Sequence, residues 1–135
     1  MIARSRGTNP ARYTRLLLTC CAMSAMPACT SQSNAPSDPN VPAAIITITS
    51  AGVSPRQVTV SRGSQVRFVN NDSQPHDMHS DPHPEHTDCP ELDQVGFLTP
   101  GQSRQSGNLV TPGVCGFHDH GLPLVTSLQG TITIQ

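Results

Sequence analysis

The chain has 135 residues, enough for one domain of ordinary size and a tail. Aromatic residues make up only 3% of it and Trp is absent, which excludes a large aromatic core. From Cys29 onward there are four Arg and nine acidic residues, a net charge of −5. An acidic chain without a basic patch argues against nucleic acid as a partner.

The first 28 residues have the layout of an export signal. Four Arg within residues 1–15 precede a short apolar run at 16–23, and small residues lead up to Ala28. This run is shorter than the roughly 18 residues that a membrane span needs, so we expect residues 1–28 to be a cleaved signal peptide. The segment resembles a bacterial lipoprotein signal, which implies acylation of Cys29. The alternative is an ordinary signal peptide that leaves Cys29 as a free thiol.

Residues 29–42 are polar and rich in Ser, Pro and Asn. We expect a flexible spacer that holds a domain away from a membrane. The mature chain is therefore expected to be exported, in the periplasm or at the cell surface, with a lipid anchor at Cys29. Disulfides persist in such compartments.

Residues 43–135 alternate between apolar and polar side chains as β-strands do. Strand patterns lie at 44–49, 57–60, 65–70 and 131–135, with turns rich in Gly or Pro between them. Short strands with frequent turns predict an antiparallel sandwich or barrel. Residues 71–98 show no clear period, and we expect a long functional loop there.

Six histidines lie within a span of 45 residues: His76, His79, His83, His86, His118 and His120. Imidazole is a common ligand of copper and zinc. Pro82 and Pro84 disfavour a helix through the first four. In a strand, His118 and His120 would share one face and Asp119 would point to the other, so the two histidines could share a metal with a loop histidine. The alternative is a set of surface histidines in a polar loop.

Cys89 and Cys115 are the only cysteines after Cys29. In an oxidising compartment we expect them to form a disulfide, which would enclose 25 residues and tie the long loop to a late strand. The alternative is that Cys115 is a thiolate ligand of a metal.

Four segments together resemble the cupredoxin superfamily, the plastocyanin- and azurin-like copper domains. Residues 68–72 with His76 resemble the strand and loop that supply the first copper histidine, and residues 98–103 resemble the turn before the penultimate strands. Residues 113–119 resemble the strand that carries the copper cysteine, and 130–134 the closing strand. For residues 43–135 this resemblance implies an all-β Greek-key sandwich or barrel of the cupredoxin type, with a long His-rich loop and copper as cofactor.

The sequence departs from the family at the copper ligands. In the register set by Gly113, Asp119 falls where the family has its copper cysteine, and Leu122 falls near the second histidine. No Met follows Met78, so the usual axial ligand is missing. A blue site needs a thiolate and two imidazoles.

We therefore expect a site without the blue-copper thiolate. Copper would lie among His76, His118 and His120, with Asp119 or one further histidine nearby. The candidates for that histidine are His79, His83 and His86. The alternative register builds a blue site from Cys115, His118 and His76.

These patterns predict a copper-binding lipoprotein of the cell envelope that captures or handles copper. Its expected partners are the copper ion, the membrane through Cys29, and a redox or copper-trafficking protein. Two alternatives stay open: a type 1 copper electron carrier that uses Cys115, and a metal-free binding or structural module. No nucleophile–base pair is evident, so we do not expect an enzyme.

Overall fold

The computed structural model describes residues 41–135. The expected signal peptide (1–28), the lipidation site Cys29 and nearly all of the spacer (29–42) lie outside the described residues. None of the helices in residues 41–135 is long and apolar enough to cross a membrane.

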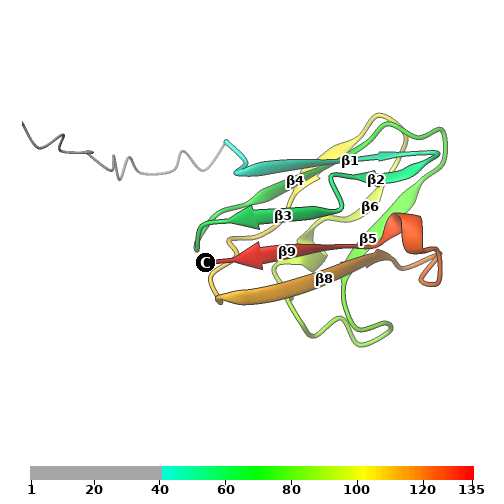
Figure 1. Cartoon of the computed structure of the whole chain (residues 1–135). Helices are drawn as coiled ribbons and strands as arrows, with labels where there is room; N and C mark the ends of the chain where they lie inside the picture. The colour runs from blue at the N-terminus through cyan, green and yellow to red at the C-terminus, as the bar shows by residue number, and fades with distance from the viewer. Residues whose placement is uncertain (1–40) are drawn as a thin grey trace, which may run out of the picture. The chain divides into compact units, whose positions relative to one another are not determined.

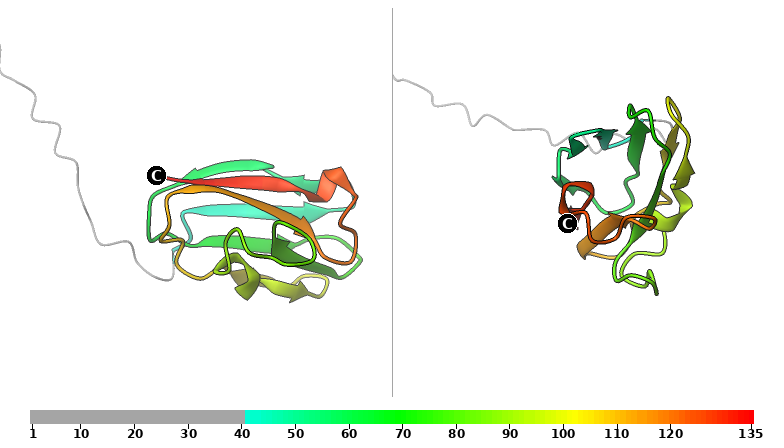
Figure 2. Two further views of the ribbon diagram at one scale, coloured as in Figure 1. Left: turned by 90° about the horizontal axis from the view of Figure 1, so that it is seen from below. Right: turned by 90° about the vertical axis from the view of Figure 1, so that its right-hand side faces the viewer.

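The described residues form two β-sheets that face each other across one core (Figures 1 and 2). The four-stranded sheet has the order β2-β1-β4-β7, with bounds Gly52–Ser54, Ala44–Thr49, Val66–Asn70 and Ser103–Gln105. The five-stranded sheet has the order β3-β9-β8-β5-β6, with bounds Gln57–Val60, Gly130–Ile134, Gly113–Asp119, His76–Ser80 and Gly96–Leu98. Two short 3₁₀ helices, η1 (Leu92–Gln94) and η2 (Thr126–Leu128), complete the fold. The predicted all-β sandwich is confirmed.

The strand pairing is mixed rather than wholly antiparallel as expected. β1 pairs with β4 in parallel, and so does β3 with β9, while the other ladders are antiparallel. The alternation of apolar and polar residues reports which face of a strand is buried. It does not report the direction of the neighbouring strand.

The core lies between the sheets and is built from aliphatic side chains and two aromatic rings. Phe68 of β4 and Phe117 of β8 meet edge to face, with ring centroids 5.2 Å apart. Such pairs contribute roughly 0.5–1.5 kcal/mol beyond the apolar area that they bury. The aliphatic residues Ile46, Ile48, Val66, Met78, Leu92, Leu98, Leu109 and Ile132 are fully buried around them.

Residues 71–98 contain more regular structure than expected. β5, η1 and β6 all lie within this segment. The alternation of β5 is hidden in the sequence because its inward-facing residues include His76 and Ser80, both buried polar side chains. A true loop remains from 81 to 91, and it projects beside β8 (Figure 1).

Candidate metal centre

β5 and β8 are neighbours in the five-stranded sheet, and their register decides where the histidines point. Met78 pairs with Asp119, and His79 pairs with His118. Successive side chains of a strand point to opposite faces. Because Met78 belongs to the core, Asp119 faces inward, and His79 and His118 face outward.

On the inner face, His76 is held between two carboxylates. Its Nδ1 lies 2.6 Å from Asp119 Oδ2, and its Nε2 lies 3.2 Å from Asp72 Oδ2. His76 and Asp119 are both buried. Both ring nitrogens therefore already have partners, and the two carboxylates approach the ring from different sides, so these groups do not converge on a point where an ion could bind.

The surroundings of Asp72 favour the ionised form of its carboxyl group. Burial raises the pKa of its carboxyl, but hydrogen bonds from His76 and from the backbone N–H groups of Ser73 and Gln74, with the charge of His76, outweigh burial and bring the pKa below its usual 3.8. Asp72 and His76 also line a surface hollow of about 390 Å³, together with Leu122 and Val125. Leu122 thus faces the hollow beside His76, where the family resemblance implied a second histidine.

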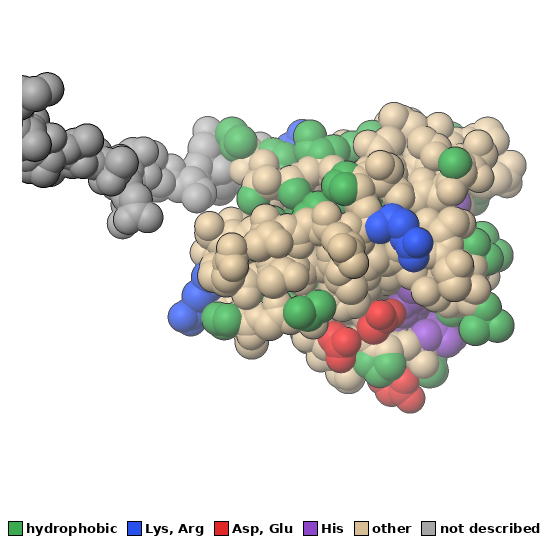
Figure 3. Space-filling model, in the orientation of Figure 1, with side chains coloured by type: hydrophobic (Ala, Val, Ile, Leu, Met, Phe, Trp, Pro, Cys, Tyr) green, Lys and Arg blue, Asp and Glu red, His purple; other side chains and the backbone are tan. Residues whose placement is uncertain are grey.

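On the outer face, five imidazoles form what we call the outer histidine cluster: His79, His83, His86, His118 and His120. Their ring centroids lie between 4.4 and 6.0 Å apart in seven pairs. Four of them, the four-histidine group of His83, His86, His118 and His120, offer ligand atoms that all lie within 4.8 Å of one another. Histidine side chains are visible at the surface next to acidic side chains (Figure 3).

His118 is the most buried member of the cluster, and a carboxylate fixes its ring. Its Nδ1 lies 2.6 Å from Asp81 Oδ1. An ionised carboxylate can only accept, so in the neutral ring Nδ1 carries the proton and Nε2 has the free lone pair. Within the described residues, this Nε2 is buried and has no hydrogen-bond partner. Metal-binding histidines are commonly oriented in this way by a carboxylate on the other nitrogen.

Gly116 makes room for that carboxylate. It lies two residues before His118 on the same face of β8, and a Cβ at this position would collide with the carboxylate of Asp81. The backbone N–H of Asp81 also donates to the Gly116 carbonyl, at 3.0 Å. A glycine at this position of the strand therefore leaves the space that the Asp81 carboxylate occupies.

His86 occupies the middle of the cluster in a left-handed backbone conformation, with φ of 55°. Its N–H donates to the Pro82 carbonyl at 2.8 Å, which helps to hold this turn. Residues other than Gly seldom adopt such a conformation unless the surrounding structure enforces it. Burial, and then the nearby His79, His120 and His118, lower the pKa of His86 below its usual 6.5, although Asp93 opposes them. Its ring is therefore neutral, and able to bind a metal, at lower pH than that of a free histidine.

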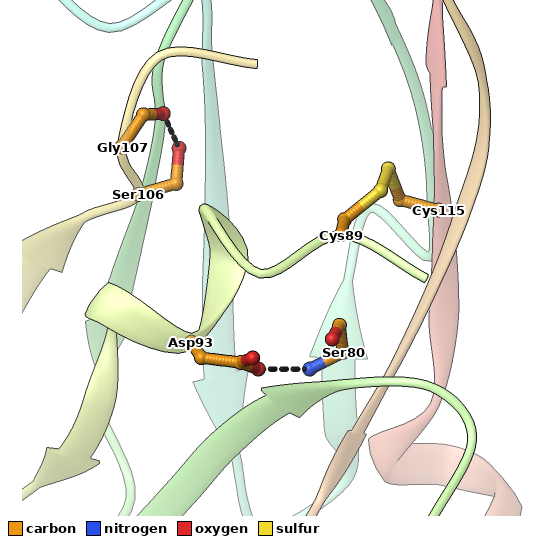
Figure 4. Close-up of a disulfide and its surroundings, with 6 residues drawn as sticks. All are labelled: Ser80, Cys89, Asp93, Ser106, Gly107 and Cys115. Carbon is orange, nitrogen blue, oxygen red and sulfur yellow. Dashed lines mark hydrogen bonds between the residues drawn. A yellow bond between two sulfur atoms is a disulfide. The ribbon is translucent and has the colours of Figure 1, made fainter. Parts of the chain in front are cut away.

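The predicted disulfide is confirmed and anchors the loop that carries His83 and His86. Cys89 is bonded to Cys115 of β8, with Cα atoms 5.8 Å apart (Figure 4). Both residues are buried. The alternative in which Cys115 is a thiolate ligand is corrected, because its sulfur is already bonded and faces the core.

The structure divides the expected site into two parts. His118 and His120 share one face and Asp119 faces the other way, as the strand pattern predicted. The grouping of His76 and Asp119 with these two histidines is corrected, because β5 and β8 direct His76 and Asp119 inward. His79, His83 and His86 lie with His118 and His120, and whether any of the five binds metal stays a prediction.

Four residues of the outer site were not predicted: Asp77, Asp81, Asp93 and Gly116. Each acidic residue lies within hydrogen-bond or ion-pair distance of a cluster histidine. Gly116 could have been found, because it lies two residues before His118 in a strand and therefore shares its face. Asp93 contacts the cluster only because η1 folds back onto β5, which no local pattern indicates.

No protein-family model matches the chain, and no curated protein matches it. Solved structures do match. A purple cupredoxin from Nitrosopumilus maritimus is 20% identical, with 68% of this chain and 99% of that one covered and a TM-score of 0.53. Oxidised plastocyanin from Dryopteris crassirhizoma is 21% identical, with 67% and 99% covered and a TM-score of 0.52. A methionine-to-alanine variant of amicyanin, described as Cu(I), is 18% identical, with 69% and 82% covered and a TM-score of 0.53.

Proposed function

We propose that this chain, which has the cupredoxin fold, binds copper on the outer face of its five-stranded sheet and serves to capture or hand on the metal at the cell envelope. The observation that carries the proposal is the four-histidine group, in which ligand atoms from four imidazoles lie within 4.8 Å of one another. The buried, unpartnered Nε2 of His118 supports it, because such a nitrogen costs roughly 1–3 kcal/mol unless something binds it.

The spacing of the rings suits a copper ion. His120 Nδ1 lies 3.1 Å from His86 Nε2. Two nitrogens bound to one metal at about 2.0–2.1 Å and at a right angle are about 2.9 Å apart, which is close to this separation. Ligation by nitrogen alone in a tetragonal arrangement favours Cu(II). The amicyanin variant with the same fold is described as holding copper, which makes copper the first metal to test.

The exposure of the ligands suits uptake and release. His83 and His120 are exposed, His86 is half-buried and His118 is 2% exposed. An ion would meet the exposed imidazoles first and exchange water for the buried nitrogen last. Open ligands permit transfer to a partner, and the absence of a thiolate at position 119 argues against a blue electron-transfer site. Export, a lipid anchor at Cys29 and a copper-trafficking partner belong to the same proposal.

The test is a titration of the full chain with Cu(II), followed by electron spin resonance. Cys20, Cys21 and Cys29 are changed to Ser first, so that free thiols do not bind the metal. We expect one tight, saturable Cu(II) with a nitrogen-rich, non-blue spectrum. In the same background His118→Ala should weaken binding at least tenfold, while His76→Gln, which removes a histidine outside the cluster, should not. Absence of saturable binding, or equal binding by His118→Ala, would refute the proposal.

A metal-free binding module is the second candidate. It is favoured by the contact between His76 and Asp119, in which the two side chains bond to each other and need no metal ion between them. It predicts that a chelator leaves the melting temperature of the isolated chain unchanged, whereas the copper proposal predicts that added Cu(II) raises it.

A further inference from the structure

We propose that the outer histidine cluster takes two metal ions side by side: copper in the four-histidine group, and Zn²⁺ in a second group formed by His79, His86 and Asp93. This inference rests on the proposed function. The ligand atoms of the second group also lie within 4.8 Å of one another. His86 belongs to both groups. We infer that its two ring nitrogens face the two ions and that its remaining N–H proton is released to solvent when the second ion binds.

Each of the two groups contains a histidine with one ring nitrogen that has no hydrogen-bond partner in the described part of the structure. His118 belongs to the four-histidine group and its free nitrogen is Nε2, and His79 belongs to the Asp93 group and its free nitrogen is Nδ1. Within the described residues both atoms are buried and lack a hydrogen-bond partner. An ion bound beside His118 satisfies the first nitrogen only.

The two nitrogens are prepared in the same way. Asp81 lies 2.6 Å from the other ring nitrogen of His118, and Asp77 lies 2.9 Å from the other ring nitrogen of His79. A carboxylate on one nitrogen orients the ring and directs the other nitrogen toward a metal. The repetition of this arrangement on neighbouring strands indicates two ligands for two ions.

Asp93 lies at ion-pair distance from His79, and the same spacing fits two ligands of one metal ion. Its Oδ1 lies 3.5 Å from His79 Nδ1, which is too long for a hydrogen bond. Two ligand atoms bound to a tetrahedral Zn²⁺ at about 2.0–2.2 Å are about 3.4 Å apart, which matches this gap. The carboxylate is held in place because Oδ1 accepts the Ser80 N–H at 2.8 Å (Figure 4).

The ligand types indicate which ion occupies each group. Four imidazoles suit Cu(II), whereas two imidazoles and a carboxylate, with water in the fourth position, are a common zinc arrangement. The backbone strain at His86, with its φ of 55°, has a reason in this arrangement, because it places one ring between both sets of ligands.

The experiment loads the full chain with one equivalent of Cu(II), in the background without Cys20, Cys21 and Cys29, and then adds Zn(II). After desalting, the metals are counted by mass spectrometry, and the copper is examined by spin resonance. We expect one copper and one zinc per chain, and a change in the copper spectrum when zinc binds, because the ions share His86. Asp93→Asn keeps the acceptor for Ser80 and should retain copper while weakening zinc at least tenfold.

The outcomes separate this inference from the proposed function. Absence of tight copper refutes the proposed function. One copper without zinc leaves that function standing and overturns the two-ion arrangement. Zinc uptake that Asp93→Asn and His79→Asn leave unchanged also overturns it, because the zinc then lies elsewhere. Asp88→Asn, an exposed carboxylate of the same loop, is the matched control and should bind both ions normally.

Discussion

Removal of the disulfide between Cys89 and Cys115 should destabilise the domain by an amount that the chain length between them sets. The bond joins residues 26 apart and ties the loop that carries His83 and His86 to β8. A cross-link restricts the unfolded chain more strongly than the folded one. For a loop of this length the entropy relation gives about 3.5 kcal/mol at 25 °C.

This loss is large for a domain of this size. For 60–100 residues, each kcal/mol shifts the melting temperature by roughly 4–8 °C, so the expected decrease is about 14–28 °C. The assay is urea unfolding followed by circular dichroism, in the background in which Cys20, Cys21 and Cys29 are Ser. The variant is Cys89→Ala with Cys115→Ala.

The control is the disulfide-bonded parent treated with a reductant. It loses the cross-link without any change of side chain, whereas the Ala variant also leaves small cavities at two buried positions. We expect the reduced parent to lose about 3.5 kcal/mol and the Ala variant somewhat more. If the free energy of unfolding falls by less than about 1 kcal/mol in both the reduced parent and the Ala variant, the cross-link adds little stability and the entropy argument is refuted.

Three further outcomes are expected. Asp81→Asn should weaken Cu(II) binding about tenfold in calorimetry, because the buried imidazole loses its charged partner, and Asp88→Asn should have no effect. Asp119→Cys with Leu122→His should produce intense visible absorption with Cu(II), because a thiolate then joins two imidazoles on the inner face; a colourless protein would contradict the inner register. Folding lowers the pKa of His86 below 6.5, so below that pH the unfolded chain binds a proton at His86 more readily than the folded chain does. The free energy of unfolding of the wild type, compared with that of His86→Asn, should therefore fall as the pH drops below 6.5. Equal differences at neutral and acidic pH would contradict this sign.

Most of the sandwich could be predicted from sequence because its strands alternate clearly. β1, β3, β4 and β9 have β-branched or aromatic residues on the buried face. β5 could not be recognised, because two of its three buried residues, His76 and Ser80, are polar. The carboxylates that bond to His76 lie outside the strand. The parallel pairings of β1 with β4 and β3 with β9 depend on chain topology, which local alternation does not encode.

The sequence could predict which residue types make up the candidate site, but not which of them lie together. The opposite orientations of Asp119 and its two neighbouring histidines follow from strand geometry alone. The position of His76 depends on the register between β5 and β8, which pairs Met78 with Asp119. No residue pattern reports that register, and a difference of one residue would have moved every histidine of β5 to the other face.

The segment His118-Asp119-His120 explains why a metal would lie outside the sandwich and not at the inner position. The same strand directs two imidazoles outward and one carboxylate inward, and that carboxylate lies 2.6 Å from His76 Nδ1. Both ring nitrogens of His76 already have carboxylate partners, so an ion could recruit His76 only by displacing Asp119 from Nδ1 or Asp72 from Nε2. His118 on the outer face has no such contact to lose, because its Nε2 has no protein partner within the described residues. The carboxylate at position 119 therefore both removes the thiolate that a blue site needs and makes the outer face the less costly place to bind copper.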